Sequence, residues 1–227
     1  MKVPKLTLVA TNLVLLLPIA AGLILWSQIP DRVPIHFNLH GEPDGWCGKS
    51  LGVVGFPLIL LASNLFVQGA LLVALWSASL SAKKKENLNS VSLIVNISLW
   101  ILPIIFLLVQ GMVLSSALGK SVNCFWLIPM IAGAVFVIFG NYMPKCRQNP
   151  VVGIRLPWTL VDEDNWAYTH RVGGWAWTVG GLLVMFFAFL EWLIACISVF
   201  VVMNVIPVAA SYLYSRRVRN DVVPGGH

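Results

Sequence analysis

The feature that most constrains this chain is an apolar tract of about forty residues, between Gly173 and Tyr214, in which Glu191 is the one charged residue. An α-helix needs about 20 predominantly apolar residues to cross the hydrocarbon core of a bilayer. The tract is twice that long. We therefore predict that it forms two membrane-spanning helices joined by a tight turn at Glu191.

Four more apolar runs of about this length precede the tract, at about residues 6–26, 52–80, 91–117 and 122–139. The chain of 227 residues is 58% apolar and 11% charged, whereas soluble domains have roughly a quarter of their residues charged. The runs do not alternate between apolar and polar residues, as strands of a membrane β-barrel would. The first run is longer than the core of a signal peptide, so we expect it to be retained. The sequence thus predicts an all-α integral membrane protein with six transmembrane helices.

The basic residues decide the predicted orientation. Six spans put both termini on one side, and Lys and Arg are enriched in cytoplasmic segments. If the N-terminus is cytoplasmic, three of the 15 basic residues lie outside, Arg32, Lys49 and Lys120, and the other twelve lie inside. We therefore expect a multi-pass protein of the cell membrane with cytoplasmic N- and C-termini. This clustering at segment ends also argues against direct nucleic-acid binding.

Two regions follow from these spans. Residues 1–117 are expected to form an N-terminal membrane region with an external loop, 27–50, rich in Pro, His and Gly. Residues 118–227 are expected to form a C-terminal membrane region with a structured cytoplasmic loop, 140–174, between helices four and five. Within the spans, amide side chains occur at Asn12, Asn64, Gln68, Asn96, Gln110 and Asn204. We interpret them as hydrogen-bonding groups between helices in preference to a transport path.

The cytoplasmic loop is dense in residues that fix backbone shape or form directed hydrogen bonds. Thr159 and Asp162 have the spacing of a capping box, although Asp replaces the preferred Glu or Gln. We predict that they begin a short helix over 160–171 that lies along the inner membrane surface. Asp162, Trp166 and His170 are four residues apart and would share one face of this helix.

Arg155 of this loop has two interpretations that the residues leave open. Its guanidinium group presents five donors in a planar fork and stays charged. It could hold the loop together through carboxylates, for example those at 162–164, or through carbonyl groups at helix ends. It could instead bind a partner or an anionic group, an interpretation that we favour slightly less than the structural one.

The external loop brings together His36, His40, Glu42 and Asp44, which are residue types that bind divalent metals. Because Pro and Gly residues punctuate the stretch, we favour tight-turn chemistry over a metal site for Gly41 to Gly45. No metal-protease helix, Ser–His–Asp set or phosphate-binding glycine loop is evident in the sequence, so we predict no catalytic residues, no metal site and no cofactor. We hypothesise that His36 and Asp44 shape a lid over the outer ends of the helices.

Both loops carry motifs of one family. The motif of the first loop comprises Pro30, Pro34, His36, Phe37, Gly41, Asp44, Gly45 and Lys49. The motif of the second comprises Gly140, Asn141, Pro144, Lys145, Asn149, Gly153, Ile154, Arg155, Pro157, Trp158, Thr159, Leu160, Trp166, Thr169, His170 and Arg171. Together they resemble the SdpI-like membrane proteins, although Leu156 stands where the family pattern has Thr.

The resemblance implies a non-enzymatic immunity protein that protects a bacterium from a membrane-active antimicrobial peptide. It also implies signal transduction, in which the protein engaged by an extracellular toxin peptide recruits a cytosolic transcriptional repressor to the bilayer. Two other classes remain open: an exporter of small solutes or peptides and, less favoured, a membrane metal-dependent enzyme. The absence of charged residues from the middle of the predicted spans speaks against ion-coupled export.

Overall fold

The computed structural model describes residues 3–38, 42–80, 92–120 and 126–222. In this part of the chain, six helical segments are long and apolar enough to cross a membrane. They are Lys5–Ile24, Leu51–Ser79, Ile94–Ala117, Leu127–Lys145, Glu163–Phe189 and Leu193–Val218. The predicted all-α fold with six membrane-spanning helices is therefore confirmed.

The chain forms two compact units, which are described separately. One comprises residues 2–73 and 95–125, and the other residues 74–94 and 126–227 together with residue 1. We refer to them as the N-terminal and C-terminal units.

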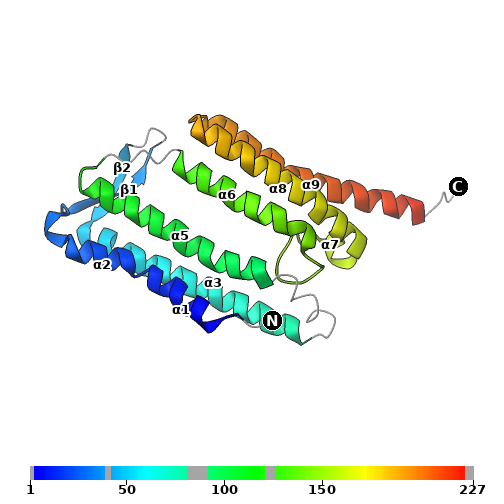
Figure 1. Cartoon of the computed structure of the whole chain (residues 1–227), viewed down its shortest axis with the longest axis horizontal. Coiled ribbons are helices and arrows are strands. Elements are labelled where there is room, and N and C mark those ends of the chain that lie inside the picture. The colour runs from blue at the N-terminus through cyan, green and yellow to red at the C-terminus, as the bar shows by residue number, and fades with distance from the viewer. Residues whose placement is uncertain (1–2, 39–41, 81–91, 121–125, 223–227) are drawn as a thin grey trace. The chain divides into compact units, whose positions relative to one another are not determined.

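The N-terminal unit begins with a span made of two helices, α1 (Lys5–Val14) and α2 (Leu17–Ile24). Pro18 occupies the first turn of α2, where its missing N–H is tolerated, and it interrupts the hydrogen bonding that would continue α1. A short turn, η1 (Trp26–Gln28), then leads to an antiparallel hairpin. The strands of this hairpin are β1 (Arg32–Phe37) and β2 (Pro43–Gly48) (Figure 1).

This hairpin corrects the expectation that residues 43–45 serve only as turn residues. Pro43 is the first residue of β2, a position at which a strand tolerates proline. Gly45 lies opposite His36, and a Cβ atom at Gly45 would stand 2.7 Å from the His36 Cβ. The register shifts next to this pair, so an irregular ladder accommodates the glycine and proline residues within a strand.

The hairpin leads into a five-residue π-helix, η2 (Leu51–Gly55), which continues as α3 (Phe56–Ser79). The remaining span of the unit is α5 (Ser92–Ala117), which contains Pro103. Hairpin, π-helix and α5 share one apolar cluster. Its buried members are Ile29, Val33, Val53, Val113, Leu114 and Ala117.

Four amide side chains of these spans form hydrogen bonds between segments, whereas the side-chain oxygen of a fifth, Asn96, is buried without a partner in the described part of the chain. The amide of Asn12 donates to Gln68 and accepts from Asn64, each at 2.9 Å, and Gln68 donates to the hydroxyl of Thr11 at 2.9 Å. Gln110 donates to the Gly52 carbonyl of the π-helix at 2.7 Å. The interpretation of Asn12, Asn64, Gln68 and Gln110 as hydrogen-bonding groups between helices is thus confirmed.

The C-terminal unit contains α6 (Leu127–Tyr142), η4 (Met143–Lys145), α7 (Pro157–Val161), α8 (Glu163–Phe189) and α9 (Leu193–Val222). Helix α6 packs along α8, and α8 packs along α9 (Figure 1). Glycines allow the close approach of α6 and α8, because a Cβ atom at Gly133 would lie 2.6 Å from the Gly181 carbonyl oxygen. The predicted break at Glu191 is confirmed, and this residue adopts a positive φ of 58° in the turn between α8 and α9.

The predicted surface helix over 160–171 is wrong. Asp162 caps the start of α8, since its carboxylate accepts the backbone N–H groups of Asp164 and Asn165 at 2.9 and 3.1 Å. Helix α8 then runs without interruption from Glu163 to Phe189. Residues 163–171 are therefore the first turns of a spanning helix. The capping box expected from Thr159 and Asp162 is also absent, because the two residues belong to different helices.

Candidate functional site

The loop between η4 and α7 is built around Asn149, which is only 3% exposed. The side-chain oxygen Oδ1 of Asn149 accepts the backbone N–H groups of Val151 and Val152 at 2.9 and 2.8 Å. Its amide nitrogen donates to the carbonyl groups of Arg147 and Val152 at 2.8 and 3.0 Å. One side chain therefore closes the loop on itself, in the manner of an Asx turn.

A buried aromatic pair fastens this loop to α8. The rings of Trp166 and His170 stack with their centroids 4.0 Å apart. The indole N–H of Trp166 donates to the Cys146 carbonyl at 2.8 Å. His170 Nε2 accepts the backbone N–H of Ile154 at 3.0 Å, so its ring proton lies on Nδ1, which donates to the Trp166 carbonyl at 2.8 Å. The expectation that Asp162, Trp166 and His170 share a face is confirmed for Trp166 and His170, whereas Asp162 caps the start of the helix.

Gly153 lets the loop pass directly over this pair. Its φ of 132° is one that side-chain-bearing residues rarely adopt. A Cβ atom there would lie 2.4 Å from His170 Nε2 and 2.7 Å from the Trp166 ring.

Thr159 fixes the end of the loop where α7 begins. Its side chain is fully buried, and its hydroxyl accepts the Leu156 N–H and donates to the Ile154 carbonyl, both at 2.9 Å. Pro157 occupies the first turn of α7, where no N–H donor is needed.

A second buried network links α7, α8 and α9, and it includes two residues that sequence reasoning missed, Asn165 and Ser211. The Trp158 indole donates to the Ser211 hydroxyl at 2.7 Å, and that hydroxyl donates to the side-chain oxygen Oδ1 of Asn165 at 3.1 Å. Thr169 donates to the same oxygen at 2.9 Å. The one available signal for Asn165 was its position four residues before Thr169.

Several of the remaining motif residues have exposed side chains, among them Asn141, Pro144 and Arg155. Pro144 packs against Gly174, whose Cβ would stand 2.6 Å from the proline ring. No described hydrogen bond or ion pair joins Arg155 to another residue, so the loop keeps its shape through Asn149, Thr159 and the aromatic pair. Exposed basic side chains surround this loop at Lys145, Arg147, Arg155 and Arg171.

Two side chains with reactive atoms, His170 and Cys146, are engaged in holding the loop. Both ring nitrogens of His170 are engaged in hydrogen bonds, so neither is available to a metal or to a substrate proton. Burial raises the pKa of the Cys146 thiol to about 11, which keeps it protonated and a poor nucleophile at neutral pH.

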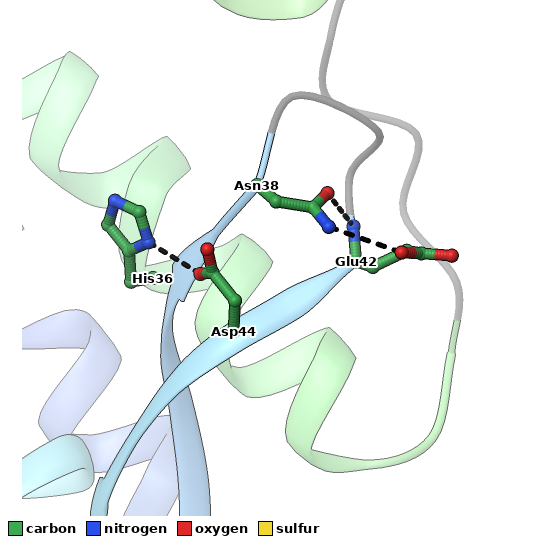
Figure 2. Close-up of polar contacts among 4 residues, drawn as sticks. All are labelled: His36, Asn38, Glu42 and Asp44. Atoms are coloured by element: carbon green, nitrogen blue, oxygen red, sulfur yellow. Dashed lines mark hydrogen bonds and ion pairs between the residues drawn. The ribbon is translucent and has the colours of Figure 1, made fainter.

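The hairpin brings His36 and Asp44 together, with 2.5 Å between His36 Nδ1 and Asp44 Oδ1 (Figure 2). Asn38 and Glu42 close the hairpin end, where the Asn38 amide donates to the Glu42 carboxylate at 3.1 Å. The His36 side chain is 73% exposed. No group of three or more metal-binding side chains occurs among the described residues, and His40 and Gly41 lie outside them.

Fold and site together define a multi-pass helical membrane protein with one exposed hairpin and one structured, basic loop. Residues 145–215 match the SdpI/YfhL protein family, and residues 13–61 match a domain of unknown function, DUF1648. The chain is 27% identical over 212 residues to "Immunity protein SdpI" of Bacillus subtilis (strain 168), covering 92% of this chain and 96% of that protein. The resemblance to the SdpI-like membrane proteins is thereby confirmed. No solved structure matches.

Proposed function

We propose that this chain is an immunity protein that protects a bacterium from a membrane-active antimicrobial peptide. The observation that carries the proposal is the similarity to an immunity protein along nearly the whole of both chains. It covers the hairpin and the loop as well as the spans.

The proposal assigns different work to the two segments. The hairpin, with His36 and Asp44 at its surface, is the segment that an extracellular peptide meets first. The loop around Arg155 carries exposed cations on a rigid frame, which suits an acidic surface of a cytosolic partner. A transcriptional repressor recruited to the membrane is the partner that the family resemblance suggests.

This assignment requires the hairpin and the loop to lie on opposite sides of the membrane. Single cysteines at positions 42 and 163, in a chain whose own cysteines are replaced, test it with a membrane-impermeant maleimide on intact cells. We expect labelling at position 42 and none at position 163 until the membrane is permeabilised. The reverse pattern would exclude the proposed orientation.

Protection is tested by expressing the chain in a sensitive bacterium and measuring survival against purified membrane-active bacterial peptides. We expect survival to rise for at least one peptide, and an Asn149→Ala variant serves as the control with a disrupted loop. Membrane abundance is measured for both proteins. The proposal would be wrong if every peptide killed the cells as before and the purified protein transported a solute in vesicles. That result would indicate an exporter.

A further inference from the structure

The N-terminal unit has an open apolar groove of about 850 Å³ where the hairpin joins the membrane helices. The residues that line it are Leu23, Trp26, Ser50, Leu51, Val54 and Gly55. We propose that this groove binds an anionic phospholipid, with an acyl chain along its apolar wall and the phosphate at Lys49. This inference does not depend on the immunity function.

The walls of the groove come from the end of the first span with the turn that follows it, and from the π-helix. Leu23 lies in α2 and Trp26 in η1, whereas Leu51, Val54 and Gly55 belong to the π-helix. π-Helical turns are rare in proteins, and those that occur are often found at functional sites. Here the Gln110 amide holds this turn through the Gly52 carbonyl.

The rim of the groove is cationic. The Lys49 ammonium lies 4.8 Å from the centroid of the Trp26 ring, which places the charge beside the groove wall. The backbone N–H of Lys49 donates to the Asp31 carbonyl at 2.9 Å, which fixes the base of this side chain. Within the described residues no carboxylate pairs with Lys49, so its charge can meet a phosphate. The neighbouring Ser50 is exposed and offers a hydroxyl donor.

Polarity changes along the groove as it does along a phospholipid. Lys49 and Ser50 stand between the last residue of β2 and the first residue of the π-helix, whereas Leu23 and Val54 lie within the apolar spans. Leu23 and Leu51 are 55% and 47% exposed and would contact an acyl chain. A cationic peptide fits less well, because Lys49 would repel it at the rim.

The test compares two lipids with identical acyl chains, dioleoyl phosphatidylglycerol and dioleoyl phosphatidylcholine. Native mass spectrometry of the purified full chain measures the affinity of the first bound lipid. We expect the parent to prefer the anionic lipid by about fivefold, the effect of one lysine near a membrane phosphate. Lys49→Gln should abolish this preference.

A matched control exists in the C-terminal unit. Lys145 also lies over an aromatic ring, 5.1 Å from the centroid of Tyr142, and neither residue lines this groove. Lys145→Gln should therefore keep the preference. Leu23→Trp, which fills the groove from an exposed position, should weaken the binding of both lipids.

Three results would overturn the proposal. One is equal affinity of the parent for the two lipids. Another is equal loss of preference in Lys49→Gln and Lys145→Gln, which would indicate a general charge effect. The third is unchanged lipid binding in Leu23→Trp, which would place the lipid elsewhere.

Discussion

Replacing His170 with phenylalanine removes one of the hydrogen bonds that fasten the loop to α8, together with a bond inside α8. Phenylalanine keeps an aromatic ring against Trp166, where the native rings stack at 4.0 Å. It removes the acceptor for the partly buried Ile154 N–H and the donor to the Trp166 carbonyl. An orphaned buried N–H costs about 1–3 kcal/mol, and the second lost bond costs about 1 kcal/mol. We therefore expect the free energy of unfolding to fall by roughly 2–4 kcal/mol.

Thermal unfolding of the purified protein in detergent measures this loss. For a chain of this length each kcal/mol lowers the midpoint by about 2–4 °C, so a decrease of roughly 5–15 °C is expected. His36→Phe is the matched control, because the His36 side chain is 73% exposed and its loss should shift the midpoint by less than about 2 °C. A His170→Phe midpoint equal to that of the parent would refute the role given to this bond.

Three further predictions concern the same loop. Gly153→Ala should destabilise the protein more than Gly119→Ala, measured as the thermal midpoint, since both glycines have positive φ but open space surrounds only Gly119. In variants that each retain one cysteine, a maleimide at pH 8 should modify Cys47 at least tenfold faster than Cys146, whose thiol becomes reactive only as the pH approaches about 11. Because the Arg155 side chain is exposed, Arg155→Ala should leave the thermal midpoint within about 2 °C of the parent and lower protection in the survival assay. A large loss of stability would instead indicate that Arg155 holds the loop together.

The spans were predictable from the sequence because each depends on length and composition alone. The turn at Glu191 was predictable for the same reason: forty apolar residues exceed one crossing. The hairpin was not predictable, since its second strand contains Pro43 and Gly45, which are uncommon within strands. Those residues are accommodated by an irregular register against His36, a long-range pairing that no local pattern reports.

The loop illustrates a second limit of sequence reasoning. The motif identified residues that matter to its structure, including Asn149, Thr159 and His170, but not the bonds that they form. Asp162 follows Thr159 by three residues, which is the spacing of the second residue of a capping box. In the structure it instead caps the start of the next helix. The sequence alone cannot distinguish these roles, because both place an acidic side chain near backbone N–H groups at a helix start.

The same motif contains two physically different kinds of residue. Asn149, Thr159 and His170 are buried and form hydrogen bonds with backbone groups. Replacing any of them should therefore lower the free energy of unfolding. Asn141 and Arg155 are exposed and support no described part of the fold. If both kinds matter to protection, the buried residues act by holding the frame, and the exposed ones act through what the frame presents to a partner.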